Sequence, residues 1–365
     1  MTSQFRSKIL NYCLLITLLV LPNCHKNPTE SGTDSAYNWE LSKPDAQGMD
    51  SEILNAALVE AKNRTFIDGL VIIKNGYLIA EEYYNGYSKN SAHNVMSVSK
   101  SFLSALAGIA LREGYLDSLN QKMIDFFPEY IYPAMDSRKN DITVRNLLMM
   151  RAGIDHEQNN YFQIYNSANW IKTTLELPLL SDPGIKFRYN TFQTHLLSAI
   201  ITKASNMSTL EFANKFLIKS LGISIHQWEQ DPQGYYFGGN SMFFTPRDMA
   251  RLGYLYLHGG IIDGNQIVPA QWAVESITNF TGFTDLTWGD LKNYNYGYLW
   301  WLGELKGYRV FFALGHGGQF IMNFPELDMI IVATSESKVD WDTADEHERS
   351  VMNVIANYIL PALKD

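Results

Sequence analysis

Three short segments of the sequence carry side chains that together could turn an alcohol into a nucleophile. In the first, Ser97 and Lys100 form an S-x-x-K motif directly before an apolar helical pattern that begins at Phe102. Side chains three positions apart share one helix face, so the hydroxyl and the amine are expected to lie within reach of each other. A serine needs a neighbouring base, and a helix start favours an oxygen that carries negative charge. This spacing indicates nucleophilic catalysis by Ser97.

The motif alone is a weak signal. A second copy, Ser335 to Lys338, follows a β-rich run and opens no apolar helix, so it is expected to be a solvated loop. By itself, Ser97 is more often a helix N-cap followed by a surface lysine. A lysine acts as the base only where burial or a nearby positive charge lowers its pKa. The interpretation of Ser97 therefore depends on what else the chain offers.

The second segment runs from Phe187 to Thr191 and precedes a helical pattern at 196–201. A phenol near a lysine can act as general base and general acid, because the cation favours the phenolate. Tyr189 is the candidate for this role. It is also one of 21 tyrosines, and simple packing is the alternative.

The third segment surrounds His316 with glycines, including Gly317 and Gly318, after a β-rich run. Glycine lets a substrate lie close to a strand edge. The backbone N–H of Gln319, together with that of Ser97, is expected to form an oxyanion hole. The alternatives are an ordinary turn and a hydrogen-bonded core histidine.

The elements that would position these segments follow from hydrophobic periodicity. Helical patterns cover 50–62 and 102–110, with Gly114 as a stop, and a closing helix is predicted over 351–360. Two β-rich runs at 69–74 and 77–84 meet at Asn75-Gly76, a strong hairpin signal. Further strands are predicted at 309–314 and 329–334.

This order predicts an α+β protein rather than an alternating parallel one. Residues 46–115 and 290–365 are expected to build one antiparallel sheet domain flanked by helices. Residues 116–289 are expected to form an inserted, mostly helical domain, and the active cleft should lie where the two meet.

Taken in this order, the three segments resemble the serine β-lactamase-like superfamily. The closest likeness is to its branch of class C β-lactamases, D-alanyl-D-alanine carboxypeptidases and esterases, and it extends over about 46–360, including 142–148, 245–251 and 324–328. The resemblance implies a β-lactamase/transpeptidase-like fold and an acyl-enzyme on Ser97. Lys100 would deprotonate Ser97 or support its deprotonation, and Tyr189 would pass the proton to the leaving group and later activate water. Which of the two is the formal base stays open.

Two departures from the family pattern bear on the substrate. Thr191 stands where the Tyr-x-Asn motif has an asparagine that contacts the substrate amide. His316-Gly317-Gly318 replaces Lys-Thr-Gly, and a mostly neutral histidine should bind a substrate carboxylate less well than lysine. The 6-aminohexanoate-oligomer hydrolases resemble this chain in lacking that lysine. An esterase or amidase acting on a small or peptide-like substrate is therefore expected.

Two alternatives stay open. One is a D-alanine carboxypeptidase or a true β-lactamase, and the other is a non-catalytic, penicillin-binding-like envelope protein. The aromatic run at 294–301 suits either an acyl pocket or the packing of a sheet face.

Composition excludes several other functional classes of protein. The 365 residues hold 29 Lys+Arg against 38 Asp+Glu, a net charge of −9, which argues against nucleic-acid binding. The two cysteines, Cys13 and Cys24, leave the body without a cysteine nucleophile or thiolate metal ligand. Neither H-E-x-x-H nor G-x-S-x-G occurs. No metal or cofactor is expected, and the oligomeric state is open.

The first 24 residues are predicted to be an export signal. Arg6 and Lys8 precede an apolar run that is short for a membrane span, and the run ends at Leu21-Pro22-Asn23-Cys24. This ending resembles a bacterial lipobox, although Asn23 departs from the usual small apolar residue. Residues 25–45 are polar and are expected to form a flexible tether. A periplasmic or cell-surface lipoprotein anchored at Cys24 is expected, with plain secretion as the alternative.

Overall fold

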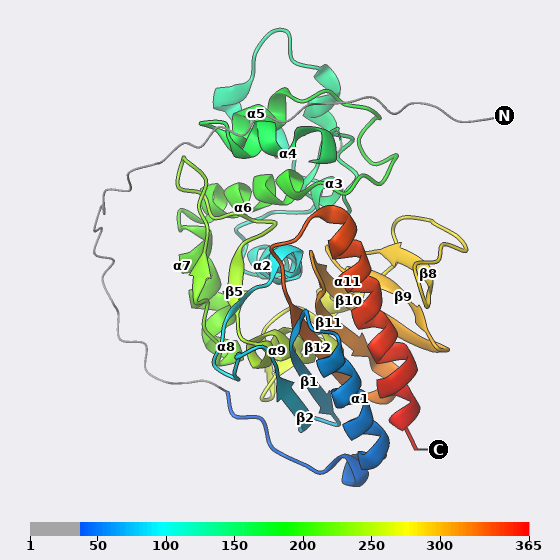
Figure 1. The fold of residues 1–365 in the computed structure, drawn as a ribbon. Coiled ribbons are helices and arrows are strands. Elements are labelled where there is room, and N and C mark those ends of the chain that lie inside the picture. The colour runs from blue at the N-terminus through cyan, green and yellow to red at the C-terminus, as the bar shows by residue number, and fades with distance from the viewer. Residues whose placement is uncertain (1–36, 156, 365) are drawn as a thin grey trace, which may run out of the picture. The chain divides into compact units, whose positions relative to one another are not determined.

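One antiparallel sheet joins segments from both ends of the chain. The computed structural model describes residues 37–155 and 157–364. The strands of the main sheet are β1 (Ile67–Lys74), β2 (Tyr77–Tyr83), β8 (Leu291–Tyr296), β9 (Trp301–Leu305), β10 (Tyr308–Gly315), β11 (Gln319–Phe324) and β12 (Met329–Ser335). Their order is β2-β1-β12-β11-β10-β9-β8, and every neighbouring pair is antiparallel (Figure 1). The predicted α+β class with an antiparallel sheet is confirmed.

The hairpin between β1 and β2 turns at the predicted dipeptide. Asn75 and Gly76 both have positive φ, 51° and 80°. A two-residue turn with this backbone matches the twist of the flanking strands, and Asn-Gly tolerates it well. Local sequence therefore fixes the register of this hairpin.

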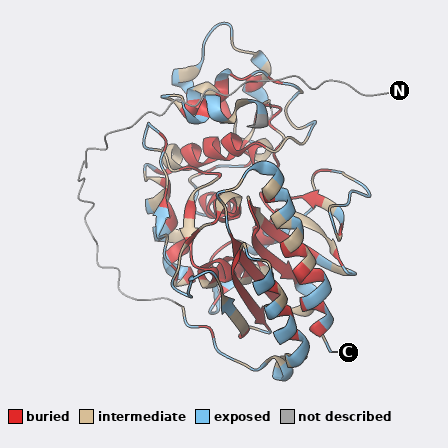
Figure 2. Cartoon of the chain, in the orientation of Figure 1, coloured by how far each residue is buried: buried red, intermediate tan, exposed pale blue. Residues whose placement is uncertain are grey.

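Helices cover both faces of the sheet. On one face lie α1 (Ser51–Asn63) and α11 (Trp341–Val354), and on the other lie α2 (Ser99–Arg112) and α9 (Pro246–Leu257). Neighbouring residues of β1 enter different cores: Ile72 packs in the core with α1 and α11, whereas Val71 packs in the core with α2. Figure 2 shows the resulting pattern, a buried sheet with helices exposed on their outer sides. Burial on both sides explains why β1 reads as a continuous apolar run.

The middle of the chain supplies mainly helices and loops. The helices are α3 (Val144–Leu148), α4 (Glu157–Tyr165), α5 (Trp170–Glu176), α6 (Thr191–Ser205), α7 (Thr209–Ala213), α8 (Lys219–Leu221) and α10 (Ala270–Ser276). Short strands are β3 (His93–Asn94), β4 (Gln227–Trp228), β5 (Met242–Phe244), β6 (Ile261–Ile262) and β7 (Asn265–Gln266). Helix α2 contacts both β10 and α6, so it lies where the sheet meets the helical region.

The closing helix begins earlier than predicted. α11 starts at Trp341, capped by Asp340, whose Oδ1 accepts hydrogen bonds from the backbone N–H groups of Asp342 and Thr343 at 3.1 Å. Its first ten residues are mostly polar and give no apolar periodicity, which is why the pattern indicated only the later turns. The extension matters because it carries side chains toward the site described below.

Residues 37–45 pack on the body, which differs from the predicted tether over 25–45. Trp39 is buried, and the guanidinium of Arg251 lies 3.4 Å from the ring centroid of Tyr37. Two aromatic side chains in a polar stretch are enough to dock it. The predicted signal segment 1–24, with Cys13 and Cys24, and residues 25–36 lie outside the described residues. No helix within 37–155 or 157–364 has the length and apolar character needed to cross a bilayer.

Candidate active site

The nucleophile candidate lies in a strained turn at the start of α2. Ser97 belongs to a 3-10 turn, η2 (Met96–Val98), that runs directly into the helix. Met96 has φ 51°, which is uncommon for a residue other than glycine. Its N–H donates to Asn94 Oδ1 at 2.9 Å, and the hydroxyl of Ser99 donates to its carbonyl oxygen at 2.6 Å. These bonds hold the strained residue and fix the direction of Ser97.

Lys100 connects Ser97 to two other segments. The side chain is buried, with 1% exposure. Its Nζ donates to Ser97 Oγ at 2.8 Å, to Thr191 Oγ1 at 3.0 Å and to the carbonyl oxygen of Gly239 at 2.7 Å. The predicted proximity of the serine and the lysine is therefore present in the structure, and the amine is held in place by oxygens from distant parts of the chain.

Gly239 is a site residue that sequence reasoning missed. A Cβ at this position would overlap Thr194 Oγ1 and atoms of Thr191. Only glycine allows the backbone to come close enough for its carbonyl oxygen to reach the lysine. No local pattern in the sequence distinguishes this glycine from the others.

Tyr189 lies beside Lys100 at the entry to α6. Lys100 Nζ is 4.8 Å from the centroid of the tyrosine ring, and Trp301 stacks on that ring with centroids 5.6 Å apart. Asn190 caps α6: its Oδ1 accepts from the N–H of Phe192 at 2.8 Å, and its Nδ2 donates to the carbonyl oxygen of Asp155 at 2.7 Å. The cap fixes the turn from which Tyr189 projects.

The hydroxyl of Thr191, predicted as a substrate contact, accepts a hydrogen bond from Lys100. Thr191 is 3% exposed and is the first residue of α6. It lines the same cavity as Ser97. In this structure it positions the amine as well as bordering the space available to a substrate.

The third predicted segment lies at the turn between β10 and β11, and only some of its residues line the cavity with Ser97. Leu314 and His316 line the cavity with Ser97, whereas Gln319 pairs with Gly315 inside the sheet ladder. The buried side chain of Gln319 donates to the carbonyl oxygen of Ser335 at 2.7 Å and accepts from its N–H at 3.1 Å.

Gly318 has φ 102°, and a Cβ there would lie 3.1 Å from both Ser335 Oγ and Val351 Cγ2. The glycine thus faces β12 and α11. The structure brings Ser97, Lys100, Tyr189, Thr191 and His316 to one site, and it places Gly318 and Gln319 outside the described lining of the cavity.

The cavity, here called the Ser97 cavity, has a volume of about 840 Å³. Its walls are mostly aromatic and apolar, with two acidic side chains. The described residues that line it are Met96, Ser97, Tyr161, Phe162, Tyr189, Thr191, Asn240, Trp301, Leu314, His316, Ser337, Val339, Asp340, Trp341 and Glu348. A space of this size with few polar groups suits a small organic substrate. Among the described residues, no group of three or more His, Cys, Asp and Glu side chains is arranged to hold a metal ion.

His316 is oriented by the start of α11. Its Nε2 donates to the carbonyl oxygen of Val339 at 2.9 Å, and its ring meets Trp341 edge-on with centroids 4.8 Å apart. A carbonyl oxygen can only accept, so this nitrogen carries the proton. The ring is thereby held at the wall of the cavity.

Glu348 on α11 is the second residue that sequence reasoning missed. Its Oε1 accepts from the N–H of Gly317 at 3.3 Å, and burial raises the pKa of its carboxyl from 4.5 to about 8. The hydrogen bond from Gly317 opposes this rise. In the sequence Glu348 is one acidic residue in a polar helical stretch, and no signal separates it from its exposed neighbours.

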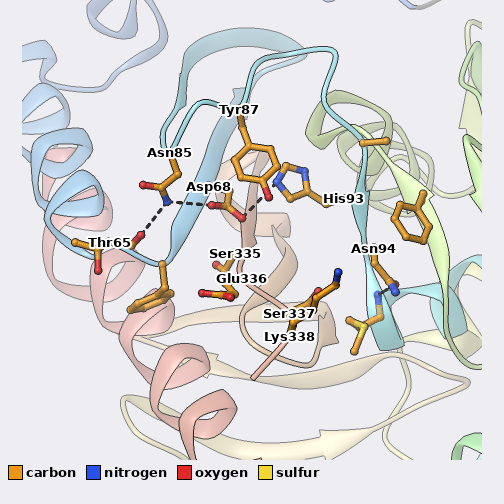
Figure 3. A pocket seen from close by; sticks show the side chains of 14 residues that line it. Thr65, Asp68, Asn85, Tyr87, His93, Asn94, Ser335, Glu336, Ser337 and Lys338 are labelled. Atoms are coloured by element: carbon orange, nitrogen blue, oxygen red, sulfur yellow. Dashed lines mark hydrogen bonds and ion pairs between the residues drawn. The ribbon is translucent and has the colours of Figure 1, made fainter. Parts of the chain in front are cut away.

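A second cavity of about 570 Å³, here called the Asp68 cavity, shares Met96 and Ser337 with the Ser97 cavity. Figure 3 shows Asp68 next to His93, with Oδ2 and Nε2 3.5 Å apart, and Asn85 Nδ2 donating to Asp68 Oδ1 at 3.0 Å. The second S-x-x-K copy also lines this cavity, but Ser335 is the buried last residue of β12, so only Glu336 to Lys338 form the loop expected from the sequence.

Comparison with known proteins shows the family to which this chain belongs. Residues 56–353 match the family model described as Beta-lactamase, and the chain belongs to that family. The predicted resemblance is confirmed. A 6-aminohexanoate-dimer hydrolase of Paenarthrobacter ureafaciens is 26% identical over 320 residues, which cover 80% of this chain and 77% of that relative.

Solved structures show the same fold at lower identity. The octameric penicillin-binding protein homologue from Pyrococcus abyssi has a TM-score of 0.65 and 18% identity, covering 86% of this chain and 77% of that chain. EstCE1, a hydrolase with promiscuous acyltransferase activity, has a TM-score of 0.67 and 15% identity, covering 84% and 97%. The family's fold is thus one on which hydrolases are built.

Proposed function

We propose that the protein is a serine hydrolase that cleaves an ester or amide bond through an acyl-enzyme on Ser97. The observation that carries this proposal is the 2.8 Å contact between Lys100 Nζ and Ser97 Oγ beside an open cavity. The ring of Tyr189 lies 4.8 Å from the same nitrogen. A nucleophile that is hydrogen-bonded to a buried amine, with a phenol nearby as a second proton carrier, is an arrangement suited to acyl transfer.

In the proposed reaction, the Ser97 hydroxyl gives its proton to the pair formed by Lys100 and Tyr189. Its oxygen bonds to the substrate carbonyl carbon, and the carbonyl oxygen takes the negative charge. The bond to the leaving alcohol or amine then breaks as the pair returns a proton to it. Water attacks the acyl-enzyme in the same way, which releases the acid and restores Ser97.

For the oxyanion hole we infer the backbone N–H groups of Ser97 and Gln319, as the sequence predicts. Gln319 is the first residue of β11 and pairs with Gly315 at the end of β10. A Cβ on Gly315 would overlap the carbonyl oxygen of Val95, so the end of β10 lies against the turn that carries Ser97. Donors fixed in this way need no rearrangement when charge develops.

The lining of the cavity favours an ester or amide substrate without a negative charge over an anionic substrate. No Lys or Arg is among the described residues that line the Ser97 cavity, and Leu314 and His316 occupy the wall formed by the end of β10. A β-lactam or D-alanyl carboxylate would therefore lack a cation to pair with. The relative named as a 6-aminohexanoate-dimer hydrolase also supports hydrolysis.

Covalent labelling tests the proposal. A fluorophosphonate probe, followed by intact-protein mass spectrometry, should add one label to the wild type and none to Ser97→Ala. Ser337→Ala is the matched control, because Ser337 lines the same cavity and should not affect labelling. Labelling that persists in Ser97→Ala would refute the assignment of the nucleophile.

A substrate panel separates the alternatives. Turnover of p-nitrophenyl esters or of amides ahead of nitrocefin is expected. Nitrocefin hydrolysis or D-alanine release that exceeds ester cleavage would favour a β-lactamase or carboxypeptidase. Ligand binding without any turnover would favour a non-catalytic envelope protein.

We also propose that the chain is exported and anchored by lipid at Cys24. The support is the sequence pattern that ends at this cysteine. Mass spectrometry of the membrane fraction should find acylated Cys24 at the mature N-terminus. Release of Cys24→Ser into the soluble fraction is expected, and unchanged membrane retention of that variant would contradict the anchor.

A further inference from the structure

We propose that the Ser97 cavity selects substrates that carry a positively charged group, such as a primary or quaternary ammonium, and that Glu348 confers this selectivity. The proposal rests on the proposed hydrolase function and specifies its substrate class. It rests on the charges that line the cavity, on the aromatic side chains around them and on the partners of Glu348.

The charged lining of the Ser97 cavity is acidic. Asp340 and Glu348 border it, and no Lys or Arg does among the residues that the structure describes. Asp340 caps α11, and hydrogen bonds to its carboxylate from Thr343 lower its pKa, so it stays ionised. Lys100 is 1% exposed and donates to Ser97, so it presents little charge to the cavity. A cation entering this space meets carboxyl oxygens, whereas an anion meets no counterion.

The carboxyl of Glu348 has capacity for a ligand. Its one hydrogen bond among the described residues comes from Gly317, and no ion pair within 37–155 or 157–364 involves it. The nearest arginine along the helix, Arg349, is paired with Asp345 at 2.7 Å. A carboxylate can accept about four hydrogen bonds, so an ammonium group could be received without breaking the bond to Gly317.

Aromatic rings complete a site suited to a cation. Tyr161, Phe162, Tyr189, Trp301 and Trp341 line the Ser97 cavity. Phe162 is 74% exposed and Trp341 57% exposed, so both rings are accessible to a ligand in the cavity. Trp301 is stacked between Tyr189 and Tyr294, so the exposed rings of Phe162 and Trp341 are the ones expected to attract an ammonium group.

Glu348 also gives the selectivity a pH dependence. Burial raises the pKa of Glu348 to about 8, so its carboxyl is mostly neutral at pH 7. A bound cation favours the ionised form, so binding releases a proton at neutral pH and tightens as the pH rises toward 9. The charged and titratable groups near Glu348 are Asp345 and Arg349 on its own helix and Tyr294 on β8, and His316 and Asp340 line the same cavity. The pKa of Asp345 is lowered and that of Tyr294 is raised, so neither changes charge between pH 6.5 and 9.

A pair of isosteric thioesters tests the proposal. Acetylthiocholine and 3,3-dimethylbutyl thioacetate differ in one atom, a cationic nitrogen against a neutral carbon. Both substrates depend equally on the protonation of Ser97, Lys100 and Tyr189, so this dependence drops out of the ratio of their kcat/KM values. At pH 9 we expect a ratio of about tenfold or more, as carboxylate and cation–π contacts supply, and a several-fold smaller ratio at pH 6.5.

Variants assign the effect to one side chain. In Glu348→Gln the ratio at pH 9 should fall several-fold, to the wild-type value at pH 6.5, and lose its pH dependence, since the amide cannot ionise and only Asp340 and the aromatic rings remain. Glu346→Gln, on the exposed side of the same helix, should keep the wild-type ratio. A wild-type ratio near one, or an unchanged ratio in Glu348→Gln, would overturn the proposal.

A binding measurement covers the case in which Glu348→Gln does not fold. Choline should inhibit the wild type more strongly than its neutral isostere 3,3-dimethyl-1-butanol. Calorimetry in buffers of different ionisation enthalpy should show proton release near pH 7. Equal inhibition by both compounds would refute the proposal. Absence of turnover of both thioesters, together with absent fluorophosphonate labelling, would instead contradict the proposed hydrolase function.

Discussion

Replacement of Glu348 by glutamine should stabilise the protein at alkaline pH and change little in acid. Burial raises the pKa of this carboxyl from 4.5 to about 8. Between these values the unfolded chain loses a proton that the folded protein keeps. The unfolding free energy therefore falls by about 1.4 kcal/mol per pH unit, because the unfolded state binds fewer protons. The stability linked to Glu348 is fully present below pH 4.5 and is lost as the pH rises through 8.

The size of the difference in unfolding free energy follows from the same pKa values. A change of about 3.5 in pKa corresponds to about 5 kcal/mol, and water in the open cavity screens part of it. We therefore expect Glu348→Gln to be about 2–5 kcal/mol more stable than the wild type at pH 9 and nearly equal to it at pH 4.5. Glutamine keeps an oxygen that can accept from Gly317, so the variant retains the hydrogen bond at the turn.

Urea unfolding between pH 4.5 and 9 measures this difference. Other carboxyl groups contribute equally to both proteins, so the difference between wild type and variant isolates Glu348. Glu346→Gln is the control, because Glu346 is exposed on the same helix, and its difference from wild type should stay small at every pH. A Glu348→Gln difference that is constant across this range, or a variant that is less stable at pH 9, would refute the reasoning.

Three further substitutions probe the site. Thr191→Val removes the hydroxyl that accepts from Lys100 at 3.0 Å and should lower kcat/KM for a p-nitrophenyl ester about 10-fold to 100-fold; activity as low in Thr191→Ser would contradict a role for the hydroxyl. Gly239→Ala forces a Cβ onto a threonine hydroxyl and should destabilise the protein by about 1–3 kcal/mol in urea unfolding; an unchanged midpoint would show that the backbone can move. Gln319→Ala leaves the buried N–H and carbonyl of Ser335 without their partner and should cost about 1–3 kcal/mol of stability, a loss that thermal unfolding would detect.

Local signals were sufficient for several elements of the fold, although not for the strands β8, β9 and β11. The Asn75-Gly76 turn, the strands on either side of it and the helix after Ser97 appear where short-range patterns indicated. They are set by backbone preferences and by the spacing of apolar residues along a few turns of chain. The polar first turns of α11 gave no such signal, so its start at Trp341 was not predicted.

The sequence by itself determined the pairing of Ser97 with Lys100, because three residues of helical chain impose their proximity whatever surrounds them. Only the tertiary structure decided which side chains near the turn between β10 and β11 line the cavity beside that pair. His316 lines the Ser97 cavity, whereas the side chain of Gln319 is tied to the backbone of Ser335 on β12, because long-range packing rather than local spacing places these residues. Glu348 likewise gains its shifted pKa from burial against the rest of the fold, which no stretch of sequence reveals.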